Sequence, residues 1–568
     1  MKALVVAVTQ LARLCPWEVE ASDGLVDSLT FIDSSLEAET IVRAGYTAGV
    51  LTFLLSIPLL LAPLPWFAIF ASMVALSLLV VHIVHTTPAV LAAFRRTEAL
   101  GDAPNLVGRA VLRMQIQPSL EASVRFAADT GRGPLSRSLA GHIDRAMGTP
   151  HSGLLAFAEE WAAQFSALRR SAHLLAMAQD APEGERGRTL DRSITAMLDG
   201  TRNQMAEFTS SIRSPTTGLF AFGVMLPLAM VALVPVLPIA GYDLNIWYFV
   251  AVYNVVLPVA LFYVSLRLLA RRPVAFPPPA VGPSHPDVPD RLWLRGVWGL
   301  LAAGIAFAVT WSLGLGHLAW VVAVGVGTGV AFLLVFGPIR TVRNHVRAVE
   351  AHLTDGLYLV GRQVAEGESV ESAIELAADR VPAETGAVFA HAANLQRRLH
   401  LGVEAAFLGT YGALRDVPSP RARGTAILLG IASDEGQPAG RAIVAMADHL
   451  EELEEVENET KRQLLRVTDT LESTTAYFGP LVAGATVGMA GLLSEDAVGL
   501  TEEATAFPTE SISIVIGVYI VLLCLVLTPL TIGLRHGLDR ALIGYYLGRN
   551  LLVAMTLYVL TVFAIGLI

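Results

Sequence analysis

The chain has 568 residues, of which 54% are hydrophobic and only 16% are charged, and its mean hydropathy is +0.56. Soluble domains carry about a quarter charged residues, so this composition excludes an ordinary soluble protein and predicts a membrane protein. The formal net charge of −10 gives no basis for a nucleic-acid partner, and the two cysteines, Cys15 and Cys524, are too few for a disulfide framework.

The N-terminal segment, residues 1–44, precedes the first long apolar stretch. Leu25, Leu29 and Leu36 recur at helical spacing while acidic residues fall elsewhere, which predicts an acidic amphipathic helix over 25–41.

Nine later stretches approach the roughly 20 apolar residues that a spanning helix needs. These predicted spans are 45–62, 66–85, 216–238, 246–266, 296–314, 317–337, 475–493, 511–534 and 551–568. They fall into four groups, at 45–85, 216–269, 293–337 and 475–568. The proline-rich segment 270–292 is predicted to be an extended linker between two halves of the chain.

Two longer and less apolar regions, 86–215 and 338–474, separate the groups of spans. Apolar residues recur there every three or four positions after Ser or Pro, which is typical of packed helices. The predicted fold class is therefore all-α: a polytopic membrane protein with about nine transmembrane helices and two homologous helical-bundle domains.

Arginine sets the predicted orientation. One set of connections, 63–65, 239–245, 315–316 and 494–510, contains no Lys or Arg, whereas the alternate set is rich in Arg. By the positive-inside rule, the N-terminus, the linker and both bundle domains face the cytoplasm, and the C-terminus lies outside. We therefore expect a multi-pass protein of the cell membrane.

The two bundle domains resemble each other at an offset of 250 residues. Residues 119–129, Ser-Leu-Glu-Ala-Ser-Val-Arg-Phe-Ala-Ala-Asp, align without a gap with residues 369–379, Ser-Val-Glu-Ser-Ala-Ile-Glu-Leu-Ala-Ala-Asp. Each leading Ser, Ser119 or Ser369, can cap a helix. The repeat predicts a duplication of span–span–domain–span–span, with one extra helix at the end.

Three sequences around the second domain carry a family resemblance: Gly367-Glu-Ser-Val-Glu-Ser-Ala-Ile374, Gly402-Val-Glu-Ala-Ala406 and Ser433-Asp-Glu-Gly-Gln-Pro438. With them, the chain resembles the type II secretion system F and type IV pilus inner-membrane platform family (PilC/TadC/FlaJ-like), in its archaeal two-domain form. The resemblance covers both domains and the spans after each. In the first domain the leading Gly is replaced, giving Gln117-Pro-Ser-Leu-Glu-Ala.

The resemblance implies a non-enzymatic platform that assembles an adhesive pilus or an archaellum. It implies three partners: a separate hexameric secretion ATPase, pilin or archaellin subunits, and the lipid bilayer. A homodimer is one candidate oligomeric state. The family offers no catalytic residues to assign to this chain, and none of its features implies a cofactor.

The sequence lacks two motifs that are typical of enzymes. The only lysines are Lys2 and Lys461, and neither follows a glycine, so the chain has no P-loop. No His precedes a Glu, so there is no HExxH zinc motif. His82 and His85 are too few to make a metal site by themselves. No catalytic, cofactor-binding or metal-binding residue is predicted.

The alternative function is a membrane transporter or permease with cytoplasmic regulatory domains. Ion-coupled transporters usually place ionisable groups inside the bilayer, and the predicted span cores hold no Asp, Glu, Lys or Arg. Asn254 is the most polar mid-span residue, and we interpret it as a hydrogen-bonding contact between helices. Pro227, Pro235 and Pro258 predict kinks or breaks.

Small residues predict close helix packing. The pairs Gly325/Gly329 and Gly484/Gly488 stand four residues apart within spans, which lets another helix approach, and contact within the chain is the expected use.

An acidic run, 448–459, follows the last predicted turn. Leu450, Leu453 and Val456 mark its apolar face. The acidic side is either a solvated helix face or a docking surface for a basic patch on the ATPase. The candidate docking residues are Glu451, Glu452, Glu454 and Glu455.

Overall fold

The computed structural model is almost entirely helical. It describes residues 2–32, 34–57, 66–131, 133–148, 152–233, 246–273, 281, 285–289, 291–435, 438–498 and 509–567. This part of the chain is 86% helical and contains no β-strand. Contacts divide the chain into two compact units, 1–99 and 100–568.

The first unit contains α1 (Lys2–Arg13), α2 (Asp23–Ile32), α3 (Ala38–Leu55) and most of α4 (Trp66–Leu100). The predicted helix over 25–41 is wrong as one piece, because α2 ends at Ile32 and α3 begins at Ala38. Ser34 lies in the break, where its hydroxyl accepts a hydrogen bond from the Leu36 amide and so competes with helix continuation. Leu25 and Leu29 still form the buried face, packed against α3.

Eight described helical stretches are long and apolar enough to cross a membrane. They are Met73–Ile116, Gly184–Val231, Ile246–Ala270, Leu292–Ser312, Gly316–Ala365, Ala439–Leu492, Thr509–His536 and Arg540–Gly566. Each overlaps one predicted span, which confirms a multi-pass membrane character. The remaining predicted span, 45–62, is not among them: α3 covers its start, and its later part falls on residues 58–65, outside the described ranges.

Two bundles of helices follow the same order in the second unit. The first bundle consists of α5 (Ala103–Ile116), α6 (Leu120–Thr130), α7 (Pro134–Ala146), α8 (Gly153–Glu160), α9 (Ser166–Asp180) and α10 (Glu183–Phe220). The second consists of α17 (Leu353–Ala365), α18 (Val370–Arg380), α19 (Ala383–Leu399), α20 (Val403–Leu408), α21 (Pro420–Glu435) and α22 (Pro438–Ser473). Helices α6 and α18 stand 250 residues apart at both ends, as the sequence repeat predicts.

The aligned serines cap equivalent helices. The hydroxyl of Ser119 accepts a hydrogen bond from the Ala122 amide at 3.4 Å, and that of Ser369 accepts one from the Ser372 amide at 3.2 Å. An N-cap satisfies a helix-end amide that has no partner within the helix. The repeated sequence therefore encodes the same local structure twice.

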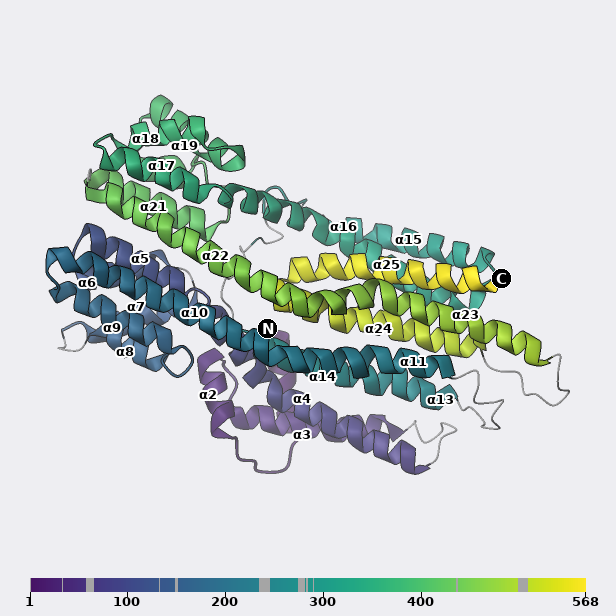
Figure 1. Cartoon of the computed structure of the whole chain (residues 1–568). Helices are drawn as coiled ribbons and strands as arrows, with labels where there is room; N and C mark the ends of the chain where they lie inside the picture. The colour runs from purple at the N-terminus through teal and green to yellow at the C-terminus, as the bar shows by residue number, and fades with distance from the viewer. Residues whose placement is uncertain are drawn as a thin grey trace. The chain divides into compact units, whose positions relative to one another are not determined.

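Each bundle continues into a span without a loop. Helix α10 runs through the π-helical segment η2 (Ala221–Met225) into α11 (Leu226–Leu233), and α22 runs through η5 (Thr474–Phe478) into α23 (Gly479–Val498). Toward the second bundle, α16 (Ala319–Glu350) leaves its span and leads into α17. The long helices α10 and α22 also contact each other along part of their length (Figure 1).

The two bundles meet through α22, which packs against α5 and α10. His449 of α22 is buried against Gly108 of α5, where an added Cβ would lie 2.4 Å from the imidazole Nε2. Between α10 and α22, the guanidinium of Arg202 lies 3.3 Å from the carboxylate of Glu455. The sequence indicated two bundles, and the fold joins them directly.

We expect Gly108→Ala to destabilise the contact between the bundles. The new methyl group overlaps His449, which is too buried to move freely, and overpacking of this kind costs about 1–3 kcal/mol. The measurement is thermal unfolding of the purified full chain in detergent. Gly187→Ala in α10 is the control, because no atom lies within 4 Å of its new Cβ, and it should not lower the midpoint. Equal midpoints for the two variants would contradict close packing of His449 against Gly108.

Candidate functional site

Helix α24 (Thr509–His536) is surrounded by irregular helical turns. It contacts η5, and it also contacts η3 (Val250–Val256), a π-helical segment between α13 (Ile246–Phe249) and α14 (Leu257–Ala270). In η2, η3 and η5 alike, a proline follows two residues after the segment, and the three are Pro227, Pro258 and Pro480. A proline has no N–H, so each interrupts the ladder of backbone hydrogen bonds within a candidate span. Such π-bulges are frequent at functional sites.

Tyrosine hydroxyls bond to backbone carbonyls around the first interruption. Pro227 cannot donate to the Gly223 carbonyl four residues earlier, and the buried Tyr519 of α24 donates its hydroxyl to that oxygen instead. Tyr253 of η3 donates to the carbonyl of Pro227 at 2.7 Å, and its ring stands edge-on to Tyr519 with centroids 5.4 Å apart. The two tyrosines thus join three candidate spans through the carbonyls of Gly223 and Pro227.

At Pro480 a cysteine thiol, rather than a tyrosine hydroxyl, lies near the carbonyl that lacks a backbone donor. Pro480 cannot donate to the Thr475 carbonyl five residues earlier, which would be its π-helical partner, and the Cys524 thiol lies 3.8 Å from that oxygen. The thiol also lies 4.0 Å from the carbonyl of Asn550, whose side-chain amide donates to the Thr528 hydroxyl at 3.1 Å. A line of buried polar contacts therefore follows α24 between the two π-bulges.

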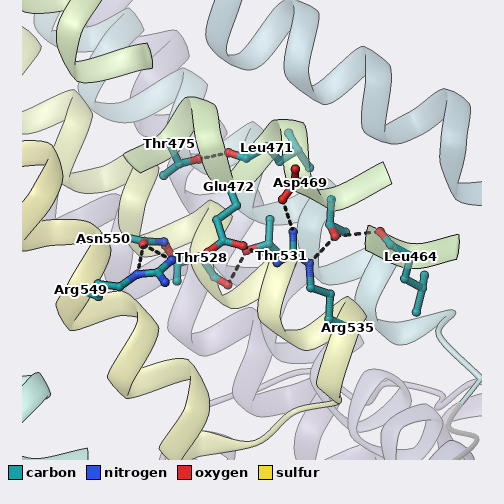
Figure 2. Close-up of polar contacts among 11 residues, drawn as sticks. Leu464, Asp469, Leu471, Glu472, Thr475, Thr528, Thr531, Arg535, Arg549 and Asn550 are labelled. Carbon is teal, nitrogen blue, oxygen red and sulfur yellow. Dashed lines mark hydrogen bonds and ion pairs between the residues drawn. The ribbon is translucent and has the colours of Figure 1, made fainter. Parts of the chain in front are cut away.

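The line ends in a charged cluster next to the second bundle (Figure 2). The carboxylate of Glu472, at the end of α22, pairs with the guanidinium groups of both Arg535 and Arg549. Arg535 also donates to the Thr468 hydroxyl at 2.6 Å, and its guanidinium lies 3.6 Å from Asp469. The side chains of Glu472 and Arg535 are only 12% and 10% exposed, so these charges depend on one another rather than on water.

Two further arginines link helices near the end of α24 and the start of α25 (Arg540–Gly566). The buried Arg272, after α14, donates from Nε to the Leu534 carbonyl at 2.8 Å, and burial lowers the pKa of Arg272 to about 10, so it stays protonated at neutral pH. Arg343 of α16 pairs with Asp539, which also caps α25 by accepting from the Ala541 amide at 2.8 Å. The arginines that predict the orientation of the chain also bind its spans together.

These polar and charged contacts connect α22, α24 and α25 with their neighbouring helices. Tyr253, Tyr519 and Glu472 each bond to a group of another helix. Among the described residues, no three His, Cys, Asp or Glu side chains come together as metal ligands. The cluster can therefore link a displacement of α22 to α24 and α25, because their charged ends share one carboxylate.

The predicted docking residues do not form one free surface. All four are exposed on α22, with Leu450, Leu453 and Val456 buried beneath them. Three of them contact other helices: Glu451 accepts from the Tyr358 hydroxyl at 3.2 Å, Glu455 pairs with Arg202, and Glu454 lies near Arg421. The structure confirms the buried stripe, while the docking role of Glu451, Glu452, Glu454 and Glu455 remains a hypothesis.

The predicted small-residue pairs pack within the chain. A Cβ on Gly484 or Gly488 would lie 2.8 Å from a side chain of α25, and a Cβ on Gly329 would lie 2.9 Å from the Gly548 carbonyl. A Cβ on Gly325 would likewise meet Met555 of α25 at 2.5 Å. Contact within the chain is therefore confirmed for both pairs.

Other residues singled out in the sequence have local roles. His85 lies 3.2 Å from the Val42 carbonyl and stands edge-on to Tyr46, which places it in packing between α4 and α3. Asn254 lies in η3, and its Oδ1 accepts no hydrogen bond from a described residue, so the expected helix contact through that atom is absent from the described part of the chain. Pro235 lies outside the described residues.

Sequence reasoning missed Glu472, Tyr519 and Cys524. A signal for Glu472 existed in the polar stretch that immediately precedes the span at 475–493, but its partners, Arg535 and Arg549, are more than 60 positions away. Tyr519 and Cys524 look like ordinary span residues until the carbonyls opposite them are known.

We expect Tyr519→Phe to lower the free energy of unfolding by about 1–2 kcal/mol, because the Gly223 carbonyl stays buried without its donor. Pro227→Ala supplies a backbone N–H to that carbonyl, so Tyr519→Phe should cost less in a Pro227→Ala background. The measurement is a double-mutant cycle by unfolding in mixed micelles, with the exposed Tyr248→Phe as the control. Strict additivity of the two changes would contradict a shared carbonyl.

Comparison with known proteins identifies no relative of this chain: no protein-family model, no curated protein and no solved structure matches it. The family resemblance carried by residues 367–374 and the sequences that follow therefore stays a prediction.

Proposed function

We propose that the chain is a membrane-embedded assembly platform for a type IV pilus-like filament, coupling a separate cytoplasmic secretion ATPase to the insertion of pilin subunits. The observation that supports it most is the duplicated mechanical design. Two bundles with the same helix order each lead, through one continuous helix and one π-bulge, into a span. A platform with no chemistry of its own needs such a connection between a cytoplasmic motor and the bilayer.

The proposal includes the finer topology. The two bundles are homologous domains on the cytoplasmic side, the segment 45–62 is a ninth span, and the C-terminus lies outside, as the arginine distribution predicts. The motor would move the bundles, and α10 and α22 would carry that movement to the spans. The π-bulges after them are the places where a helix bends most readily, because their backbone hydrogen bonds are already interrupted.

The test is purification of the full chain from native membranes in a mild detergent, followed by mass spectrometry of bound proteins. We expect a P-loop secretion ATPase together with short proteins that carry an apolar N-terminal segment. An intact, monodisperse protein that retains neither partner would contradict the proposal. Substrate flux in liposomes would then support the transporter alternative.

The docking hypothesis predicts the effect of reversing one charged surface. Changing Glu451, Glu452, Glu454 and Glu455 to Lys should abolish recovery of the ATPase while pilin-like proteins and the elution profile of the chain are unchanged. Because Glu455 also pairs with Arg202, the control is Glu455→Gln, which removes that ion pair without reversing the surface. Undiminished recovery of the ATPase with the fourfold variant would refute the docking role.

A further inference from the structure

Helices α15 (Leu292–Ser312) and α16 border a groove near the start of α15. Two adjoining hollows, of about 690 and 480 Å³, share Arg295 and Leu334 in their linings. The larger hollow also has polar walls from Asp287, Thr341 and His345. Apart from Arg295, the smaller hollow is lined by apolar side chains, which are Trp298, Leu301, Ala302, Ile305, Val330 and Leu334. The groove therefore has a polar head and an apolar limb that meet at one arginine.

Backbone geometry creates this groove. At Gly299 the two helices touch, since an added Cβ would lie 2.6 Å from the Ala331 Cβ. One turn earlier, a Cβ on Gly296 would make only an ordinary 3.6 Å contact with Val335. Pro338 lies inside α16 and interrupts its backbone hydrogen bonds. Prolines within a helix commonly bend it. The two helices therefore pack more closely at Gly299 than at Gly296, on the side of the groove.

Arg295 lines the polar head, and no described carboxylate pairs with it. His345 lies 3.8 Å from Glu384, and Asp287 lies 3.8 Å from His285, so these two lining residues have partners of opposite sign. No carboxylate among the described residues comes within ion-pair distance of the Arg295 guanidinium. An anionic group in the head would therefore meet an arginine whose fork of donors is free to bind it.

The position of the groove indicates where such an anion comes from. α15 is one of the eight candidate spans, and Arg295 lies in its first turn, at the boundary where lipid phosphates are found. Trp298, one turn further, is 61% exposed, and exposed tryptophans are typical of this boundary. The apolar limb then runs along α15 toward the bilayer core.

We propose that this groove binds one phospholipid of the surrounding bilayer, with its phosphate on Arg295 and an acyl chain along the apolar limb. The arginine donates to the phosphate oxygens, and Leu301, Ala302 and Ile305 contact the chain. The proposal does not depend on filament assembly, because it rests only on the shape and charge of α15 and α16.

The experiment is native mass spectrometry of the full chain purified in a mild detergent, with dioleoyl phosphatidylglycerol added as the probe. We expect one phospholipid to stay bound to the wild type. Arg295→Gln should weaken its retention by about tenfold or more, the loss expected for a charge-assisted contact. Ala302→Trp should weaken it as much by filling the limb while leaving the head unchanged.

The matched control is Arg291→Gln, which removes a neighbouring arginine that does not line either hollow. It should retain the phospholipid as the wild type does. Equal retention by wild type, Arg295→Gln and Ala302→Trp would overturn the proposal, and displacement of the lipid by inorganic phosphate alone would show a phosphate site instead. A photo-crosslinker at Ile305 that joins residues 1–99 or a second copy, rather than lipid, would also overturn it.

Discussion

Glu472→Gln should destabilise the chain by about 3 kcal/mol or more. The substitution keeps the size of the side chain and removes the one charge that Arg535 and Arg549 share. Removing that charge leaves Arg535, whose side chain is only 10% exposed, largely without compensation, and breaking a buried ion pair typically costs 3–5 kcal/mol. The measurement is chemical or thermal unfolding of the purified full chain, compared with wild type at the same detergent concentration.

Asp469→Asn is the control for this prediction. Asp469 also faces Arg535, but its side chain is 73% exposed, and an exposed ion pair contributes about 1 kcal/mol at most. We expect a midpoint close to that of the wild type. If Glu472→Gln were as mild as Asp469→Asn, then Glu472 would not hold the ends of α24 and α25. The proposed transmission from α22 through that carboxylate would lose its basis.

We expect a second large destabilisation from Asp539→Asn, which should again lower the free energy of unfolding by about 3 kcal/mol. Asp539→Asn retains a side-chain oxygen that can cap α25, since Asn is as good an N-cap as Asp, but it removes the partner of Arg343. The Arg343 side chain is only 3% exposed, so its unpaired charge has no access to water. The expected result is a much lower unfolding midpoint even though the cap remains.

A double variant separates the charge from the cap. Arg343→Met in the Asp539→Asn background removes both charges, and replacing a buried pair with apolar groups is often close to neutral, so we expect stability within about 1 kcal/mol of the wild type. Asp539→Ala with Arg343→Met should then lose about a further 1 kcal/mol from the missing cap. A double variant that stays as unstable as Asp539→Asn would show that the ion pair is not the cause.

Several features of the fold could be predicted because their signals are local. Runs of about 20 apolar residues predict eight helices that the structure contains, and Ser119 and Ser369 predict the helix starts that they cap. A cap or an apolar run depends on neighbours a few positions away. The predicted helix over 25–41 failed for the same local reason, since Ser34 offers the backbone a competing hydrogen bond.

The charged cluster around Glu472 could not be predicted, because its members are far apart in the sequence. Prolines at 227 and 258 indicated irregular spans, but nothing near them shows that Tyr519 supplies the missing donor. Likewise, the acidic run around Glu451 drew attention by its charge density, whereas the buried Glu472, a single carboxylate in a mixed stretch, carries more interhelical contacts.

The sequence alone determined that this protein is an all-helical, multi-pass membrane protein with a repeated helical segment, because hydrophobic length, helix caps and internal repetition are properties of contiguous residues. Only the tertiary structure decided that α24 lies among three proline-associated π-bulges and that Glu472 joins α22 to α24 and α25. The physical reason is that buried polar groups must find partners wherever the fold brings them, and those partners stand at sequence separations that no local pattern records.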